Sequence, residues 1–154
     1  FIMPGDDFNT AETAVRADRD RSPYELGLGW LVNLEKTYFT GKRALSSEIQ
    51  RPAHRRLVRL SVEGNKPPKD AFLYDSMKGK RIGTIKSCVW SPILKMNIAL
   101  ADVEFNKGKL PKNIWAEIYY QKELEWRATW AKCDVSEKAF WVHSRSSATP
   151  PNNF

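Results

Sequence analysis

The sequence predicts a mostly β protein, in which a small antiparallel barrel follows a connector with one short helix. Two observations carry this prediction. Residues 54–143 contain about six short segments with strand-like patterns, and turn residues separate them. Hydrophobic residues form 42% of the 154 residues, which is enough for a buried core. The pattern suits a barrel or a sandwich, and we favour the barrel because a closed sheet has no exposed edge strand.

The elements divide the chain into three parts. We expect a connector at residues 1–53, a barrel at residues 54–143 and an extended tail at residues 144–154. Residues 6–22 are polar and charge-dense, so they predict a surface excursion with one helical turn at most. The tail is rich in Ser, Pro and Asn, a composition that is typical of extended chain.

The connector is expected to contain a turn that leads into a strand-like stretch, SPYELGLGW, at residues 22–30. Pro23 disfavours helical backbone at the residue before it. Gly27 and Gly29 then alternate with apolar residues, as they would in a strand.

A short helix is predicted at residues 41–51, GKRALSSEIQR. Thr40 precedes it and suits the N-cap position, where a side-chain hydroxyl accepts a hydrogen bond from a free backbone N–H group. Pro52 lacks the N–H group that a helix needs, so it ends the helix.

The first barrel strand is predicted in RRLVRLSVEG, residues 55–64, where the sequence pattern changes to a period of two. The two faces of this strand carry Arg56, Val58, Leu60 and Val62 on one side, and Leu57, Arg59 and Ser61 on the other. Such a pattern fits a half-buried strand better than a helix.

A hairpin is predicted next, from AFLYD at residues 71–75 and RIGTIKSCVWS at residues 81–91, with Gly79 in its turn. NIALADVEF, residues 97–105, is then expected to form a one-sided strand. Its faces carry Ala99, Ala101, Val103 and Phe105 on one side, and Asp102 and Glu104 on the other.

The last hairpin joins IWAEIYY at residues 114–120 to ELEWRATW at residues 123–130. Strict alternation over the second segment is strong evidence for a strand. Its apolar face carries Leu124, Trp126, Ala128 and Trp130, and its polar face carries Glu123, Glu125, Arg127 and Thr129.

The residues by themselves do not indicate catalytic chemistry. Cys88 and Cys133 are too few for a disulfide framework or a four-ligand zinc site, so we expect two small buried side chains in a reducing compartment, the cytoplasm. His54 and His143 stand at predicted strand ends and are expected at the surface. We therefore predict no metal site and no Cys–His enzyme, and the motifs alone leave the function open. No run of about 18 apolar residues exists, so no membrane span is expected.

The net charge is +7, and residues 52–154 alone carry about +8. Such a surface attracts nucleic acid or a small anion, but we favour the simpler interpretation of a solvated basic surface. Aromatic and basic residues near the last hairpin suggest a stacking platform for single-stranded nucleic acid, formed by Trp115, Tyr119 and Tyr120 with Lys112 and Lys122. We regard nucleic acid as the less favoured partner, because Trp115 and Tyr119 suit a buried interface equally well.

Four segments resemble, in order, the C-terminal portion of the aminomethyltransferase family, which comprises the glycine cleavage T-protein and folate-dependent demethylases. They are GDDF at 5–8, SPYELGLGW with FTGKRAL at 22–45, GKRIGTIKSCVWSPILKMNIALADV at 79–103, and the closing PPNNF. The third segment is the most specific. The resemblance covers nearly all of the chain, and the insert at residues 9–21 points toward the demethylase-like branch.

The resemblance implies a C-terminal barrel that packs with two upstream domains around a tetrahydrofolate site. The family moves a methyl or one-carbon unit from a small donor to folate, and its catalytic aspartate lies in an N-terminal portion that this chain lacks. We therefore expect N-terminal folate-binding domains as partners, from the same gene or a separate chain, and no activity from this fragment alone. SCVWSP, residues 87–92, is implied to be a barrel corner with Cys88 packed inward.

Tyr24, Glu25 and Trp30 are the predicted folate-binding residues, because the resemblance places SPYELGLGW near the domain junction. A pterin ring needs a carboxylate for its amine donors and an apolar surface for its face. Two alternatives stay open. Trp30 suits a core position and Glu25 a solvated turn, and the whole chain suits a non-enzymatic binding module, either a folate-family accessory protein or a nucleic-acid-binding barrel.

Overall fold

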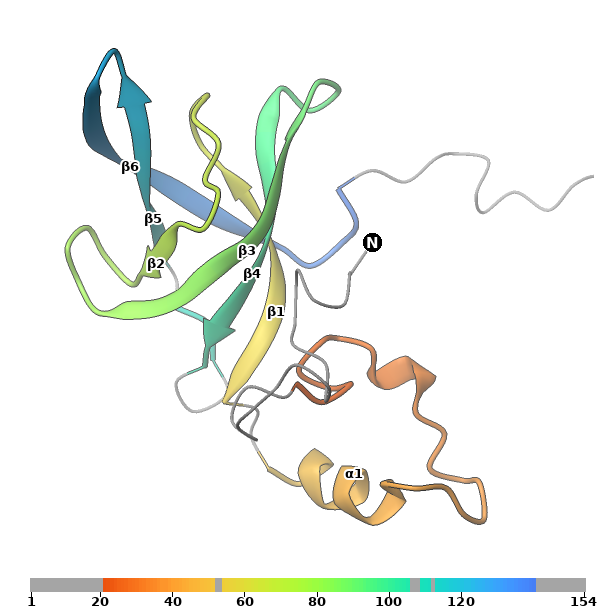
Figure 1. Ribbon diagram of the computed structural model, residues 1–154. Helices are drawn as coiled ribbons and strands as arrows, with labels where there is room; N and C mark the ends of the chain where they lie inside the picture. Colours follow the sequence, from red (N-terminus) through yellow and green to blue (C-terminus); the bar gives the residue numbers. More distant parts are fainter. Residues whose placement is uncertain (1–20, 52–53, 106–108, 112, 141–154) are drawn as a thin grey trace, which may run out of the picture.

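The strands close into one antiparallel barrel, as predicted (Figure 1). The computed structural model describes residues 21–51, 54–105, 109–111 and 113–140. Its strands are β1 (Arg55–Val62), β2 (Phe72–Tyr74), β3 (Arg81–Ser91), β4 (Met96–Glu104), β5 (Ile114–Lys122) and β6 (Glu125–Ser136). They pair in the order β1-β4-β3-β2-β5-β6, and β6 pairs with β1 to complete the circle. The barrel, rather than a sandwich, is therefore confirmed.

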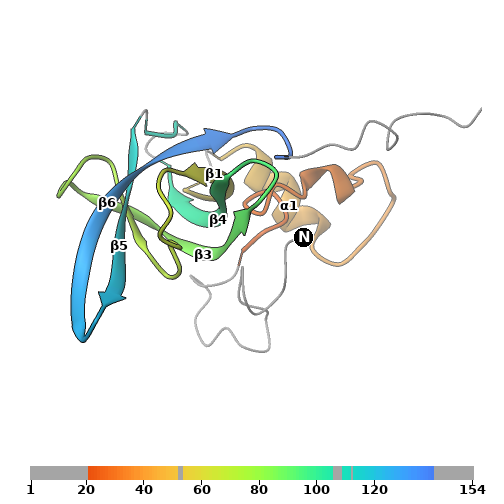
Figure 2. The same cartoon turned by 90° about the horizontal axis from the view of Figure 1, so that it is seen from above.

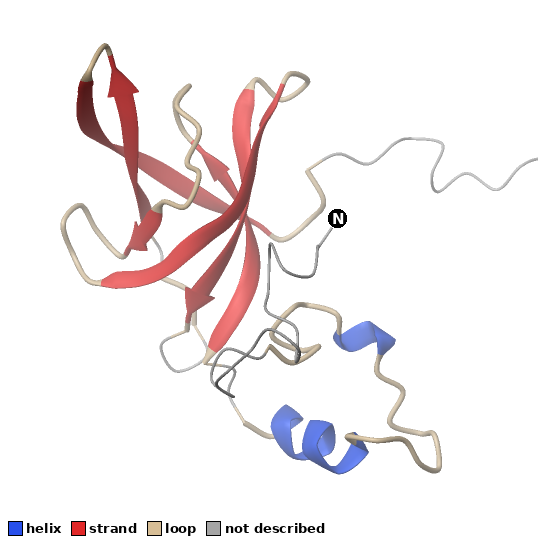
Figure 3. Cartoon of the chain, in the orientation of Figure 1, coloured by secondary structure: helices blue, strands red, loops and turns tan. Residues whose placement is uncertain are grey.

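Helical structure within the described ranges is confined to the connector (Figure 3). Helix α1 (Lys42–Ile49) lies within the predicted range of 41–51. The predicted N-cap is wrong: Gly41, not Thr40, occupies that position and makes no side-chain cap hydrogen bond. Gly41 has a φ of 90°, a left-handed backbone conformation that glycine adopts without steric cost.

The strand-like stretch expected at residues 22–30 is also wrong, because the chain there coils. The Leu26 N–H group donates to the Ser22 carbonyl at 3.1 Å, and the short 3-10 helix η2 (Gly29–Leu31) follows. Gly27 ends the first coil with a φ of 71°. The alternating glycine and leucine residues therefore form two consecutive turns, because local backbone hydrogen bonds stabilise the coiled conformation over the extended one.

The barrel interior is the hydrophobic core. Alternate residues of the strands point inward, so the period of two in the sequence becomes one buried face. The buried residues of this core are Val58, Leu60, Val62, Ala71, Leu73, Ile82, Ile85, Ala99, Ala101, Val103, Ile114, Ala116, Ile118, Ala131 and Cys133. This set contains one of the two faces distinguished in each of β1 and β4, except that Arg56 is exposed and Phe105 is only partly buried at the barrel end.

A β-bulge in β3 shifts which residues face the core. Ile85 pairs with Ala101 and Ser87 pairs with Leu100, so Lys86 is an extra residue. After it, Cys88 takes the inward position opposite Ala99. The implied corner at residues 87–92 is mostly wrong, because residues 87–91 belong to β3 and the turn lies at residues 92–95, before β4 begins at Met96. Cys88 is only partly buried.

The apolar face predicted for the last hairpin lies on the outside of the barrel. β5 and β6 pair as expected, with Gln121 opposite Trp126. The core receives Ala131 and Cys133 from β6, which occupy the opposite parity to Trp126. Trp126 is 71% exposed and Leu124 is 93% exposed. This hairpin lies on the side of the barrel away from α1 (Figure 2).

The proposed division at residues 53/54 and 143/144 stays a prediction. The strands occupy residues 55–136. The polar excursion at residues 6–20, the predicted helix stop at Pro52, His143 and the tail at 144–154 all lie outside the described residues.

Candidate binding site between connector and barrel

A hydrogen-bonded turn at the start of the connector positions the predicted site. The Glu25 N–H group donates to Ser22 Oγ, and the Ser22 N–H group donates to Glu25 Oε2, each at 3.2 Å. This reciprocal pair is the capping box of a helical turn. The Leu57 N–H group of β1 donates to the Glu25 carbonyl at 2.8 Å, so the turn is fastened to the barrel.

All three predicted site residues line one cavity of about 850 Å³ between this turn, α1 and the barrel end. Its walls also include Glu48, Ile49, Arg51, His54, Arg56 and Phe105. Trp30 is 79% exposed, so the alternative that it is a core residue is wrong. Glu25 lies in a turn and is partly exposed, and one of its carboxylate oxygens accepts the Ser22 N–H group, so the alternative of a turn residue stays open.

Tyr24 contributes a packed ring and an unsatisfied hydroxyl. A Cβ atom at Gly29 would lie 2.8 Å from Tyr24 Cδ1, so glycine at that position lets the ring pack against the backbone. The Tyr24 hydroxyl is buried and has no hydrogen-bond partner within the described part of the chain. Leaving such a group unpaired costs about 1–3 kcal/mol.

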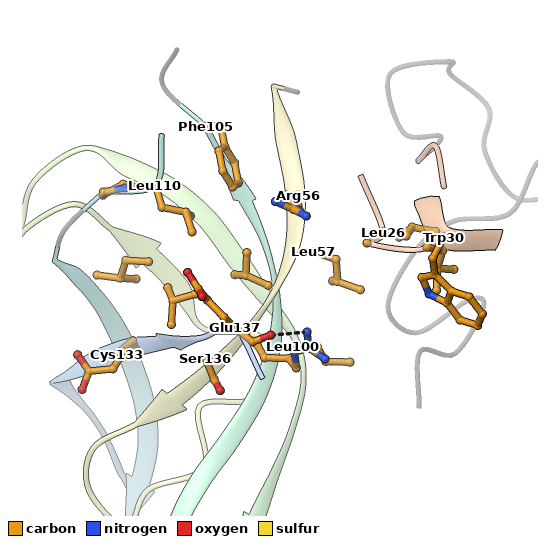
Figure 4. A pocket seen from close by; sticks show the side chains of 18 residues that line it. Leu26, Trp30, Arg56, Leu57, Leu100, Phe105, Leu110, Cys133, Ser136 and Glu137 are labelled. Atoms are coloured by element: carbon orange, nitrogen blue, oxygen red, sulfur yellow. Dashed lines mark hydrogen bonds between the residues drawn. The ribbon is translucent and has the colours of Figure 1, made fainter. Parts of the chain in front are cut away.

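A second cavity of about 890 Å³ adjoins the first and shares Gly27, Trp30, Arg56 and Phe105 with it. Figure 4 shows Leu26 and Trp30 on one side of β1, and Leu110 and Cys133 on the other. Arg56 lies on β1 between these two groups. The two cavities together reach from the connector to the open end of the barrel.

Basic side chains missed by sequence reasoning line the first cavity. Arg51, His54 and Arg56 are all exposed there, close to the predicted residues. Arg56 occupies the inward parity of β1 at the barrel end, where an interior position opens to solvent. The one signal in the sequence for a polar opening at this end is that the cationic Arg56 shares the β1 face whose other residues are apolar.

An ion cluster holds the connector against the barrel. Asp102 Oδ2 on β4 accepts hydrogen bonds from Arg21 Nη2 at 2.7 Å and from Arg55 Nη1 at 3.3 Å. Arg55 also pairs with Glu104. The Asp102 side chain is 10% exposed, although its strand pattern predicted an outward position. Asp102 is indeed outward, and the connector covers it.

The thiols are not poised for nucleophilic chemistry. Cys88 and Cys133 are both free. Burial raises the pKa of Cys133 to about 12, and burial with the nearby Asp70 carboxylate raises the pKa of Cys88. Both therefore stay protonated at neutral pH, and the thiolate is the reactive form.

Within the described ranges no group of His, Cys, Asp and Glu is arranged to hold a metal ion, and no helix is long and apolar enough to cross a membrane.

The suggested stacking platform is split between two faces. Trp115 and Tyr119 lie on one side of β5, and Tyr120, one position on, lies on the other. The Lys66 ammonium group covers the Tyr120 ring at 4.8 Å. Lys112 lies outside the described residues. These aromatic residues therefore do not form the one continuous surface that was expected.

Comparisons with known proteins agree on the barrel. Residues 55–141 match the family model of the glycine cleavage T-protein C-terminal barrel domain. Aminomethyltransferases of Synechococcus sp. strains CC9902 and WH7803 are 37% and 38% identical over 102 residues, which cover 64% and 66% of this chain and 27% of each relative. The crystal structure of glycine cleavage system aminomethyltransferase T from Bartonella henselae superposes with a TM-score of 0.61 at 23% identity. That match covers 76% of this chain and 31% of the other, so the chain spans less than a third of these relatives.

Proposed function

Because the chain belongs to the glycine cleavage T-protein family, through its C-terminal barrel domain, we propose that it is part of a tetrahydrofolate-dependent aminomethyltransferase or demethylase. Such an enzyme transfers a methyl or one-carbon unit from a small methylated donor to folate. One observation carries the proposal: Tyr24, Glu25 and Trp30 line one cavity at the junction of connector and barrel.

The residues around this cavity fit tetrahydrofolate. The exposed Trp30 ring offers a stacking surface for the pterin, and the Glu25 carboxylate retains acceptor capacity for amine donors. Arg51, His54 and Arg56 suit the carboxylates of the glutamate tail. Tetrahydrofolate would supply the nitrogen that accepts the one-carbon unit. In this proposal the barrel contributes one wall of the site and orients the cofactor.

We further propose that N-terminal folate-binding domains, from the same gene or a separate chain, complete the site and supply the catalytic residues. The connector has the surface for this. Helix α1 buries no residue, and large apolar side chains of the connector are exposed, namely Trp30, Leu31, Tyr38 and Ile49. Apolar side chains gathered on one segment are typical of an interface. Free thiols at Cys88 and Cys133 agree with a reducing compartment, and we propose the cytoplasm.

A binding experiment tests the folate site. The chain is titrated with 5-formyltetrahydrofolate by calorimetry, and Glu25→Gln and Trp30→Ala are each expected to weaken binding roughly tenfold. Trp126→Ala is the matched control, because Trp126 is similarly exposed but lies on the last hairpin. Equal affinity of all three variants would refute the site. Salt-sensitive binding of a single-stranded oligonucleotide in place of the folate would favour the nucleic-acid alternative.

A further inference from the structure

The outer surface of β2, β5 and β6 carries a concentration of aromatic side chains that the proposed function does not use. We call it the aromatic face; it consists of Phe72, Tyr74, Trp115, Tyr119, Trp126 and Trp130, with Glu117 among them. Register places Phe72 opposite Glu117, and Glu117 opposite Trp130. The face lies on the side of the barrel away from α1 (Figures 1 and 2).

The aromatic face is open to solvent. Trp126 is 71% exposed, Tyr119 is 59% exposed and Phe72 is 39% exposed. Tyr74 and Trp130 meet edge to face with their ring centroids 5.1 Å apart, which gives the centre of the surface a defined shape. Exposed aromatic side chains on a rigid sheet are enriched at protein interfaces, because they lose little conformational entropy on binding.

Glu117 gives this surface a negative centre. Its Oε2 accepts the Tyr74 hydroxyl at 3.0 Å and its Oε1 accepts the Tyr119 hydroxyl at 3.0 Å. No lysine or arginine of the described ranges forms a salt bridge with it. Each carboxylate oxygen has a second lone pair, so two acceptor positions stay available between aromatic rings.

Two cations of the chain lie on the same side. Arg81 is stacked at 3.9 Å over the ring of Phe72, which is opposite Glu117 in the register, and Lys132 is opposite Trp115 and 4.0 Å from Asp134. Neither forms a salt bridge with Glu117. The faces of aromatic rings are electronegative, so they add to the charge of Glu117. A guanidinium group suits such a centre, because it stacks on a ring and donates two parallel hydrogen bonds to a carboxylate. A phosphate group, by contrast, would be repelled by the negative charge of the Glu117 carboxylate.

We propose that the aromatic face docks a partner protein that places an arginine side chain on Glu117, against the Tyr119 and Trp130 rings. The partner's apolar residues would cover the remaining rings. This interaction is independent of the folate site, which lies at the connector end of the barrel. It also explains why the apolar side of β6 faces outward in a basic, globular chain.

Two probes of the same shape test the arginine site. The whole chain is titrated with N-acetyl-arginine amide and, separately, with its neutral isostere N-acetyl-citrulline amide, at constant ionic strength by heteronuclear NMR. We expect saturable shifts of the Glu117, Tyr119 and Trp130 amides and of the Trp130 indole with the arginine probe. Affinity for the citrulline probe is expected to be roughly tenfold lower.

Variants locate the binding on Glu117. Glu117→Gln keeps the shape of the side chain and is expected to lower the affinity for the arginine probe by the same factor of about ten. Glu125→Gln, on the other face of the hairpin, is expected to leave this affinity unchanged. Thermal melting shows whether each variant is folded. Equal shifts with both probes, or an unaffected Glu117→Gln, would overturn the proposal. So would stronger shifts with an oligonucleotide, or concentration-dependent shifts without a probe, which would assign the face to nucleic acid or to a second copy.

Discussion

The Asp102 carboxylate on β4 accepts a hydrogen bond of 2.7 Å from the Arg21 guanidinium, which comes from the connector 81 positions earlier in the chain. The Asp102 side chain is 10% exposed and that of Arg21 is 13% exposed. Within the described residues, the Leu57 N–H group also donates a backbone hydrogen bond to the Glu25 carbonyl. Asp102 therefore helps to fix how the predicted site residues lie against the barrel.

Asp102→Asn is expected to destabilise the chain by about 2–3 kcal/mol, because it removes the negative charge from the largely buried ion pair with Arg21. Chemical denaturation measures the loss. Glu104→Gln is the control, since the Glu104 side chain is 44% exposed and its pair with Arg55 is expected to contribute about 0–1 kcal/mol. Faster proteolysis of the connector should accompany only Asp102→Asn; equal effects of the two variants would contradict this role.

Gly83→Ala is expected to destabilise the barrel by about 1–3 kcal/mol, because the added methyl group has no room. A Cβ atom at Gly83 would lie 2.3 Å from the Asp102 carbonyl oxygen on β4, a backbone atom that moves only with its strand. Thr84→Ala, at the next position of β3, serves as the control. Denaturation midpoints of both variants measure the difference. A Gly83→Ala chain as stable as the parent would show that β3 and β4 can move apart to admit the methyl group at no cost, and would contradict the prediction.

Stability is expected to fall as the pH rises from 9.0 toward about 12, because burial raises the folded-state pKa of Cys133 to about 12 from its ordinary 9.0. In this window the unfolded chain loses the thiol proton and the folded chain keeps it, which favours unfolding by at most about 1.4 kcal/mol per pH unit. Below the window the contribution is fully present. Cys133→Ala should flatten the slope measured by denaturation, and an unchanged slope would assign the pH dependence to other groups.

Glu117→Gln is expected to lower the pKa of Tyr119 more than the pKa of Tyr74. The hydrogen bond to Glu117 is the main cause of the raised pKa of Tyr119, whereas burial is the main cause for Tyr74. Ring resonances followed through an alkaline titration separate the two residues. Glu125→Gln should change neither pKa, and equal shifts of both tyrosines in Glu117→Gln would contradict the assigned causes.

Tyr24→Phe is expected to change stability by less than about 1 kcal/mol or to raise it, because the hydroxyl that it removes is buried and unpaired within the described residues. Tyr38→Phe is the control, since Tyr38 is 82% exposed. Thermal melting compares the two. A large loss of stability in Tyr24→Phe would reveal a hydrogen bond from a part of the chain outside the described residues.

The sequence by itself determined the strands, the position of α1 and the family. A half-buried strand has apolar residues at every second position, as β1 has at Val58, Leu60 and Val62. The local turn at Ser22 was misjudged, because alternating glycine and leucine fit both a strand and a tight coil. The reciprocal hydrogen bonds between Ser22 and Glu25 stabilise the coiled conformation rather than the strand.

Tertiary structure decided which side of each pattern is covered, since alternation distinguishes two faces of a strand but does not say which one meets the core. It placed Trp126 in solvent and Cys133 in the core, although both belong to β6. It buried Asp102 by bringing Arg21 and Arg55 to it from distant parts of the chain. It also set Arg56 beside Tyr24, Glu25 and Trp30, because only closure of the barrel against the connector brings these residues to one cavity.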